Sequence, residues 1–369
     1  MRPLKILVIA GASGGHIFPA LGFLGALKNK DKNIDILLVI PKKRTTSHIE
    51  DYGCKVNYIS VTNIKLRFNG ESLLSIFMFF KGCWESLFII LRFRPRIVVG
   101  FGSLATLPMI SFAWLLGIKT IIHEQNVIPG KANNFLAKFT DRVALSFVQT
   151  REYFKNYQKK IVVTGNPIRK ELSRIDKDRA LSFFGFNNDK FTILVMGGSA
   201  GSHRINLEFF KAATTMPNRE KLQVIHLAGS GDFEILKNSY KGLNSNVKLF
   251  SFLKSVQYAY SAADLVISRA GATSIAEIIF FRLPAILIPY PYAYKHQLSN
   301  AELLGRAGLA MIIEDNEFDV AMLKQVIGEL ISNPQRLAAM RDHYNNTFLH
   351  SRNDLLVDEA LSLCNFVRK

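Results

Sequence analysis

The sequence has 369 residues, enough for two domains, and 49% of them are apolar, so a substantial hydrophobic core is available. Its three cysteines are far apart and show neither metal-ligand spacing nor a disulfide framework, which fits a reducing cytoplasm. The net charge of +18 indicates an anionic partner or surface. No recognised DNA- or RNA-binding motif is present, which leaves acidic lipids and phosphate-bearing substrates.

The first element is an apolar run at residues 4–10 that is followed at once by the glycine-rich stretch Gly11–Pro19. The run is too short for the core of a signal peptide, so we expect a buried strand. The following residues have helical spacing, so the stretch is a strand, a glycine turn and a helix start, where backbone amides can bind an anion. His16 is the unusual residue, because a turn that only binds phosphate needs no imidazole. It is either a packed or capping side chain or a base that accepts a proton near neutral pH.

Short apolar runs alternate with helical stretches along the whole chain, which predicts a parallel α/β architecture. In the first half the expected strands are 4–10, 35–40, 56–60, 97–100, 119–123, 142–146 and 161–164. In the second half they are 192–197, 223–228, 247–250, 265–268, 285–289 and 310–313. These sets predict two Rossmann-like, doubly wound domains that join near Gly165-Asn166-Pro167, with a ligand between them at the carboxyl ends of the strands.

The segment from Leu73 to Leu91 is long and very apolar. Lys81 and Glu85 lie in its middle, which opposes a membrane-spanning helix. On a helical wheel one broad face is apolar and the opposite face is small and polar. The apolar face contains Leu73, Ile76, Phe77, Phe80, Trp84, Leu87, Phe88 and Leu91, and the polar face contains Ser75, Gly82 and Ser86. Two interpretations stay open: a helix packed in the core for most of its length, or an apolar surface that touches lipid beside a basic group. That basic group is Lys65, Arg67, Lys81, Arg92, Arg94 and Arg96.

Two polar turns follow strands in the middle of the first half. The turn Gly100–Ser103 either approaches a ligand through its backbone or is simply tight. The run His123-Glu124-Gln125-Asn126 places four polar side chains directly after a strand, more than capping requires. We therefore expect this run to bind a ligand or to orient the domains.

Two further turns resemble anion sites in the second half. Gly197–Ser202 offers amides at a helix start but lacks the sequence of a P-loop. In the stretch 268–277, Ala272 and Thr273 open a helix suited to a diphosphate, and Glu277 lies one turn inside it. Its carboxylate suits a pair of ribose hydroxyls; alternatively, Ser268 caps the helix and Glu277 is a solvated residue. The polar residues 294–300 could meet sugar hydroxyls.

Six of these motifs, Gly11–Pro19, His123–Asn126, Gly165–Arg169, Gly197–Gly201, Ala270–Glu277 and His296–Asn300, occur in order and resemble the MurG family. Members of this family transfer N-acetylglucosamine (GlcNAc) from UDP-GlcNAc to lipid I, undecaprenyl-diphospho-MurNAc-pentapeptide, to form lipid II of peptidoglycan synthesis. The resemblance implies a GT-B fold with two Rossmann-like domains facing a cleft, an inverting reaction without a metal or other cofactor, and no nucleic-acid partner. It also implies a peripheral enzyme on the cytoplasmic face of the plasma (inner) membrane, which is an anionic surface.

The resemblance divides the chain into an acceptor- and membrane-facing domain at 1–164, a UDP-GlcNAc domain at 165–344, and a helix at about 345–369 that packs back on the first domain. His16 would be the general base for the MurNAc 4-hydroxyl. The residues that would bind the substrates are Ser13, Gly14, Gly15, Asn126, Arg169, Ser199, Leu253, Ala272, Thr273, Glu277, His296 and Gln297. Among them, Asn126 would reach the GlcNAc, Arg169 and Ser199 the UDP part, Leu253 the uracil through its backbone, and Glu277 the ribose.

The chain departs from the family pattern at several positions, which bear on donor contacts and acceptor geometry rather than on the class. Ala12 replaces a usual glycine, Ala200 a common glutamine, Ala270 a frequent serine and Lys295 a frequent acidic residue, and 100–105 lacks the usual Gly-Gly-Tyr. The alternatives are a related GT-B glycolipid synthase that uses a UDP-sugar, a sugar-nucleotide epimerase of the same plan, and a non-catalytic basic protein that binds lipid or nucleic acid. The non-catalytic alternative leaves His16 and Glu277 unexplained.

Overall fold

The computed structural model describes residues 3–42, 53–61, 70–198, 201–241, 246–293, 295–346 and 353–365. The basic residues Lys65 and Arg67 and the candidate site residue Ser199 lie outside these ranges, as does Ala200. The chain divides into two compact units, the first made of Met1–Lys170 with Ser351–Lys369 and the second of Glu171–His350.

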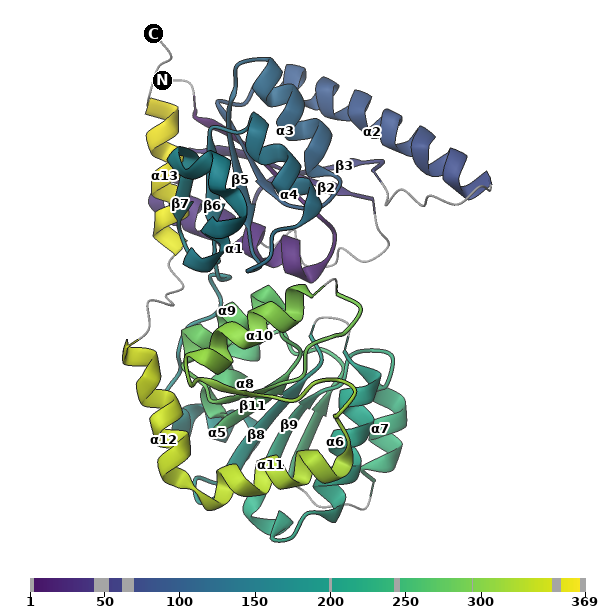
Figure 1. The fold of residues 1–369 in the computed structure, drawn as a ribbon, viewed down its shortest axis with the longest axis vertical. Coiled ribbons are helices and arrows are strands. Elements are labelled where there is room, and N and C mark those ends of the chain that lie inside the picture. The colour runs from purple at the N-terminus through teal and green to yellow at the C-terminus, as the bar shows by residue number, and fades with distance from the viewer. Residues whose placement is uncertain are drawn as a thin grey trace. The chain divides into compact units, whose positions relative to one another are not determined.

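The first unit is built on a seven-stranded parallel sheet in the order β3-β2-β1-β4-β5-β6-β7 (Figure 1). Its strands are β1 Lys5–Ala10, β2 Asp35–Pro41, β3 Lys55–Ile59, β4 Ile97–Phe101, β5 Lys119–Glu124, β6 Arg142–Leu145 and β7 Ile161–Val163. Its helices are α1 Gly14–Lys30, α2 Gly70–Phe93, α3 Thr106–Leu115, α4 Lys131–Leu136 and α13 Asn353–Asn365, with the 3₁₀ segments η2 Ala137–Phe139 and η3 Val148–Lys160.

Helices cover both faces of this sheet because successive strand residues point to opposite sides. Ile6 and Val8 of β1 join one core with α1 and α13, whereas Leu7 and Ile9 join another with α2, α3 and α4. The buried side of α13 belongs to the first core, and its Glu359 accepts a 2.7 Å hydrogen bond from Arg142 Nε at β6. The last described helix is therefore part of the first unit.

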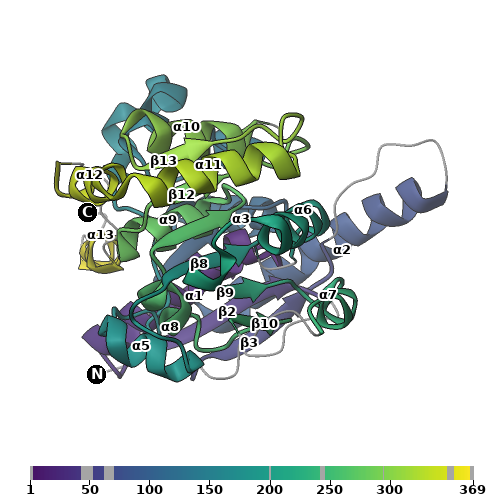
Figure 2. The ribbon, with the colours of Figure 1, turned by 90° about the horizontal axis from the view of Figure 1, so that it is seen from below.

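The second unit has a six-stranded parallel sheet in the order β10-β9-β8-β11-β12-β13. Its strands are β8 Phe191–Met196, β9 Leu222–Leu227, β10 Val247–Phe250, β11 Leu265–Ser268, β12 Ala285–Leu287 and β13 Ala310–Ile312. Its helices are α5 Lys177–Phe184, α6 His203–Thr215, α7 Phe233–Ser239, α8 Val256–Ala262, α9 Ala272–Phe281, α10 His296–Arg306, α11 Val320–Ser332 and α12 Pro334–Asp342, with η4 Arg219–Lys221 and η5 His343–Asn346. The apolar sides of α6 and α11 share one core on this sheet (Figure 2).

Every predicted strand is present, with ends shifted by at most two residues, and the prediction of two doubly wound parallel sheets is confirmed. Each sheet reverses its strand order once at a central pair of strands. The reversal lies between β1 and β4 in the first unit and between β8 and β11 in the second. Ligand sites of open α/β sheets lie at such reversals, beyond the carboxyl ends of the strands.

The long apolar helix α2 buries the face that the helical wheel marks as small and polar. Ser86 is buried and its hydroxyl donates to the Gly82 carbonyl. A Cβ on Gly82 would lie 2.3 Å from Val61 Cγ2, so only glycine allows this approach. The carboxylate of Glu85 accepts hydrogen bonds of 2.6 and 2.9 Å from the backbone N–H and hydroxyl of Ser60. These contacts fix α2 to the chain just after β3.

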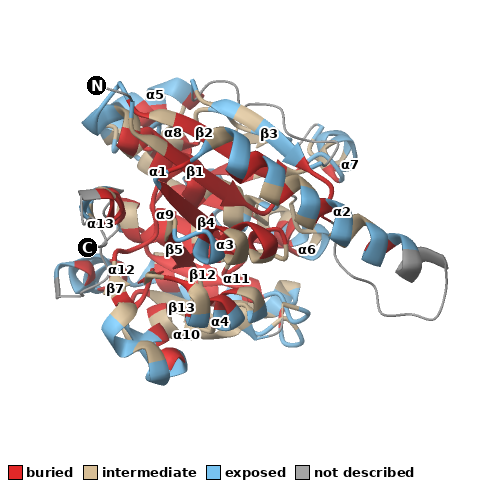
Figure 3. Cartoon of the chain, turned by 90° about the horizontal axis from the view of Figure 1, so that it is seen from above, coloured by how far each residue is buried: buried red, intermediate tan, exposed pale blue. Residues whose placement is uncertain are grey.

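The broad apolar face of α2 is exposed to solvent instead (Figure 3). Its exposed members are Ile76, Phe77, Phe80, Trp84, Phe88 and Leu91, and Leu74 beside them is exposed as well. Among the described large apolar side chains of α2, only Ile89 and Ile90 are buried in the core. The expectation of a helix packed in the core for most of its length is therefore wrong. By length and composition alone Leu74–Phe93 could cross a membrane, but it projects from the first unit while its Glu85 is bound to Ser60 (Figures 1 and 2).

Candidate active site

His16 lies in the first turn of α1, beyond the carboxyl ends of β1 and β4 where the first sheet reverses. A Cβ on Gly11, which follows β1, would lie only 2.7 Å from His16 Cδ2. A Cβ on Gly102, which follows β4, would lie 3.1 Å from His16 Cε1, and Gly102 has a φ of +73°. One glycine after each strand therefore makes room for the imidazole at the place where this fold binds ligands.

The start of α1 retains the features of an anion site. Ser13 is the N-cap residue, but its hydroxyl makes no capping hydrogen bond. Space is open around the position of a Cβ on Gly15, so a substrate can approach the backbone there. Arg169 belongs to the same unit, where its guanidinium lies 4.4 Å from the centroid of the Phe18 ring of α1. The structure thus brings Ser13, Gly14, Gly15, His16 and Arg169 to one region.

The polar run His123–Asn126, which begins in the last two residues of β5, is mainly a structural network. His123 is fully buried, and its Nε2 donates to the Gly165 carbonyl at 2.9 Å while its Nδ1 accepts from Gln125 Nε2 at 3.2 Å. Burial lowers the pKa of His123 to about 4, so its imidazole is neutral at physiological pH. His123 therefore orients the chain at Gly165.

Asn126 is the half-exposed member of that run, and its position is fixed by Glu124. One carboxylate oxygen of Glu124 accepts from the Asn126 backbone at 2.9 Å and from its side chain at 3.2 Å. The other accepts from Asn133 Nδ2 of α4 at 2.8 Å. Asn133 also lies beside His16, because the Cβ position of Gly102 is 3.6 Å from Asn133 Nδ2. The sequence did not reveal Asn133, because a single asparagine in a six-residue helix forms no recognisable pattern.

In the second unit Arg269 connects the turn after β11 to the turn after β8, where the strand order of the sheet reverses. Arg269 follows β11 and is 7% exposed, and its Nε donates to Ser202 Oγ, at the start of α6, at 3.2 Å. Its Nη1 donates to Asp315 at 2.5 Å and to the carbonyls of Ile288 and Pro289. The sequence motifs assign no role to Arg269 or Asp315. The one indication of Arg269 in the sequence is that a charged residue directly follows a buried strand.

The start of α9 has the predicted form but a different cap. Gly271 is its N-cap residue, whereas the hydroxyl of Ser268 donates to the Arg269 carbonyl, so the alternative that Ser268 caps this helix is wrong. Ala272 and Thr273 form the first turn. The hydroxyl oxygen of Thr273 is buried and finds no hydrogen-bond partner among the described residues. A buried hydroxyl in this state is costly, which favours a ligand at this turn.

Glu277 is a buried residue rather than a solvated one, with an exposed fraction of 6%. Its Oε2 accepts a 2.7 Å hydrogen bond from the hydroxyl of Tyr260 on α8, which also contacts Met196 Sδ at 3.2 Å. A buried carboxylate held in place by a tyrosine has a fixed direction. Tyr260 thus positions Glu277. The sequence did not reveal this role, because residues 256–262 have the pattern of an ordinary helix.

The remaining predicted donor residues lie on neighbouring segments of the second unit. Leu253 is half-buried between β10 and α8, and His296 and Gln297 begin α10. Gln297 Oε1 accepts from the Tyr290 backbone at 2.9 Å, and the buried Asn300 donates to the Ala270 carbonyl at 3.1 Å. These bonds join α10 to the turns after β11 and β12. Within the described ranges, no group of three or more His, Cys, Asp or Glu side chains could hold a metal ion.

Two parallel sheets, each with glycine turns and helix starts at its reversal, form the GT-B fold, which glycosyltransferases share with sugar-nucleotide epimerases. Family models agree: residues 6–145 match the glycosyltransferase family 28 N-terminal domain and residues 192–355 match its C-terminal domain. The chain belongs to glycosyltransferase family 28, and within it to the MurG family of N-acetylglucosamine transferases.

The relatives are similar over nearly their whole length. A UDP-N-acetylglucosamine--N-acetylmuramyl-(pentapeptide) pyrophosphoryl-undecaprenol N-acetylglucosamine transferase of Thermoanaerobacter sp. (strain X514) is 36% identical over 92% of this chain and 94% of its own. The enzyme of the same name from Thermodesulfovibrio yellowstonii is 35% identical over 91% and 92%. The crystal structure of Acinetobacter baumannii MurG superposes with a TM-score of 0.73 at 24% identity, covering 98% of this chain and 100% of that one. The last comparison concerns the fold alone.

Proposed function

We propose that this enzyme transfers GlcNAc from UDP-GlcNAc to the MurNAc 4-hydroxyl of lipid I and forms lipid II. The observation that carries the proposal is the place of His16, held between Gly11 and Gly102 at the sheet reversal of a chain whose relatives are named for this transfer. In the proposed reaction His16 takes the proton of the 4-hydroxyl, and that oxygen attacks the anomeric carbon of GlcNAc. The bond from this carbon to the UDP oxygen breaks, its electron pair leaves with UDP, and one displacement inverts the anomeric centre to a β-1,4 linkage.

The departing UDP gains negative charge, which the chain stabilises through fixed dipoles and cations. The amides and the Thr273 hydroxyl at the start of α9 would hold the diphosphate, Glu277 the ribose, and Leu253 the uracil. Arg169 and Ser199 would contact the UDP part, and Asn126, His296 and Gln297 the GlcNAc. Ser13, Gly14 and Gly15 would lie near the diphosphates of donor and acceptor. The reaction as proposed uses no metal or other cofactor.

The test is incubation of the purified protein with labelled UDP-GlcNAc and a lipid I analogue. We expect a product that contains both sugars and is cleaved by a β-specific hexosaminidase. UDP binding by calorimetry without any product would point to a glycolipid synthase with another acceptor or to a sugar-nucleotide epimerase. Absence of UDP binding would contradict every enzymatic interpretation of the site.

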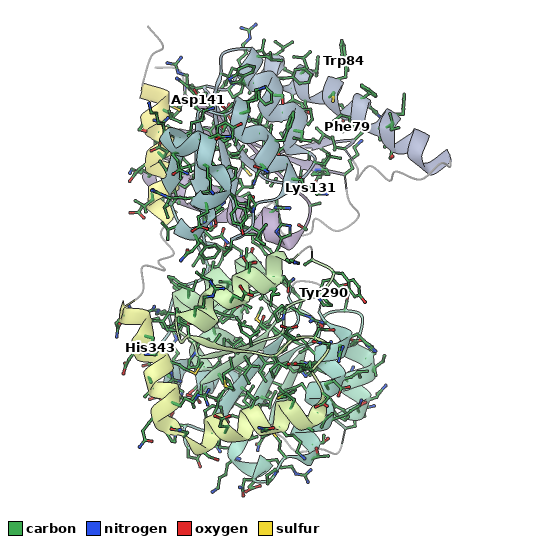
Figure 4. The ribbon with its side chains drawn as sticks, viewed as in Figure 1. Phe79, Trp84, Lys131, Asp141, Tyr290 and His343 are labelled. Atoms are coloured by element: carbon green, nitrogen blue, oxygen red, sulfur yellow. The ribbon has the colours of Figure 1, made fainter. Side chains whose placement is uncertain are left out.

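We also propose that the exposed face of α2 docks on the anionic cytoplasmic surface of the plasma membrane, which holds the lipid acceptor. Phe77 and Trp84 are 65% and 73% exposed, and Trp84 points away from the sheet (Figure 4). Lys81 and Arg92 are exposed on the same helix and would meet acidic headgroups. An apolar helix face beside basic side chains is the usual form of a peripheral membrane anchor.

Replacing Phe77 and Trp84 together by serine should lower binding to anionic vesicles at least about tenfold, because each ring contributes roughly 1.5–3 kcal/mol when fully removed from water. Vesicle co-sedimentation measures this, and the melting temperature should stay within a few degrees because both rings are exposed. Replacing Phe183 and Ile235, two exposed apolar residues of the second unit, by serine is the matched control. Equal binding by both double variants, or unfolding of the α2 variant, would contradict the proposal.

A further inference from the structure

A cleft of about 530 Å³ lies between α4 and η3 in the first unit. Two lysines, Lys131 and Lys155, line it together with the aromatic rings of Phe135, Tyr153 and Tyr157. Side-chain amides and the carboxylate of Glu152 complete the lining. None of these residues has a role in the transfer described above.

The charge of this region is strongly positive. The segments 131–139 and 148–160 contain Glu152 as their one acidic residue, against Lys131, Lys138, Arg151, Lys155, Lys159 and Lys160. Two of the aromatic rings belong to tyrosines. Their hydroxyls can form hydrogen bonds with a polar, hydrated ligand but not with a lipid chain. Lysines bind carboxylates, amides bond to peptide groups and rings pack against peptide planes, so this lining fits an acidic peptide.

The two elements that form the walls of the cleft are bonded to the end of β5 and to the loop that follows it. Asn133, the residue before the lining residue Asn134, donates to Glu124 Oε2 at 2.8 Å and to the His123 carbonyl at 3.0 Å. Asn133 also lies beside His16 across Gly102. On the other side of the cleft, Thr150 of η3 donates to the Asn126 carbonyl at 3.1 Å. One wall of the cleft is thus bonded to the last two residues of β5, and the other is bonded to Asn126 in the loop that follows.

The chemistry of the acceptor requires a peptide close to this place. A muramyl sugar carries its peptide on the ether of the carbon next to the reacting 4-hydroxyl, and the peptide ends in a free carboxylate. Five extended residues span at most about 17 Å. A surface that binds the peptide must therefore lie within a few residues' reach of the base. His16 and Asn133 of α4, the helix that forms one wall of the cleft, both lie close to the Cβ position of Gly102.

We propose that the α4–η3 cleft binds the carboxylate-bearing peptide of the acceptor, an inference that rests on the proposed function. Lys131 and Lys155 pair with peptide carboxylates, and Tyr153 and Phe135 pack against the peptide. The cleft thus selects acceptors by their peptide and contributes nothing to holding the donor.

The experiment compares two soluble acceptor analogues, one with the pentapeptide and one without it, in the wild type, Lys155→Glu and Lys159→Glu. Lys159 is exposed on η3 but does not line the cleft, so its variant makes the same charge change outside the site. We expect the wild type to have the lower KM for the peptide-bearing acceptor, and Lys155→Glu to raise that KM about five- to tenfold relative to the KM for the other acceptor. Lys159→Glu should keep the wild-type ratio of the two KM values.

A binding titration gives a second readout. The free pentapeptide should bind the wild type more tightly than its C-terminal amide, and Lys155→Glu should lose this preference. Equal KM values for both acceptors in the wild type, or equal behaviour of the two lysine variants, would overturn the inference while leaving the transferase function intact. Failure of the wild type to transfer GlcNAc to either acceptor would instead contradict the proposed function.

Discussion

Replacing His16 by alanine is expected to lower kcat by about a hundredfold or more, the usual scale for a positioned general base, while UDP binding stays near normal. The imidazole lies between Gly11 and Gly102 at the reversal of the first sheet, whereas the residues proposed for the diphosphate and ribose are on α9. Turnover with labelled UDP-GlcNAc and calorimetry with UDP measure the two effects separately.

The control for this variant is His343→Ala, which removes an exposed histidine of η5 in the second unit. Its turnover and its UDP binding should match the wild type. Unchanged turnover in His16→Ala would remove His16 from the mechanism. A loss of UDP binding together with turnover would show that the side chain supports the fold of the site rather than proton transfer.

Replacing Glu277 by alanine is expected to weaken UDP and UDP-GlcNAc alike by about 10- to 100-fold, since hydrogen bonds to a charged group contribute roughly 1.5–3 kcal/mol. The carboxylate is buried in α9 and accepts a hydrogen bond from the Tyr260 hydroxyl, so its direction is fixed. Calorimetry with both nucleotides measures the loss, and the KM for the acceptor should change little.

Tyr260→Phe separates ribose binding from a structural role of the buried pair. This variant removes the hydroxyl that donates to Glu277 but leaves the carboxylate, so we expect only a few-fold weaker UDP binding. A Tyr260→Phe variant as weak as Glu277→Ala would assign Glu277 to packing. Weakened acceptor binding with normal UDP affinity in Glu277→Ala would contradict the ribose assignment outright.

The architecture of both units could be predicted from local patterns in the sequence. Each strand is a short apolar run bounded by turn residues, and strands alternate with helices, so both sheets and their parallel sense follow from periodicity. The glycine turns were also visible in the sequence, because glycine directly after a buried strand usually marks a tight turn or a close approach of the backbone. Glu277 and His16 stood out because charged and titratable groups in such turns are unusual.

The partners of these residues did not follow from the sequence. Arg269 bonds to Ser202 and Asp315 through contacts that span 67 and 46 positions, and Asn133 reaches the His16 region only because α4 packs beside β5. Such pairs depend on strand order and on the approach of distant segments. The periodicity of the sequence indicates neither the strand order nor which distant segments meet.

Helix α2 shows most clearly which features the local sequence pattern determines and which features depend on packing. Its length, its apolar face and its small polar face can all be read from the amino-acid order, because both faces follow from a period of 3.6 residues. Which face is buried depends on the packing of the folded chain. Val61, after β3, approaches so closely that only glycine fits at position 82, and Ser60 beside it binds Glu85. The physical reason is that periodicity sorts side chains onto faces, whereas the neighbour that covers a face comes from elsewhere in the chain.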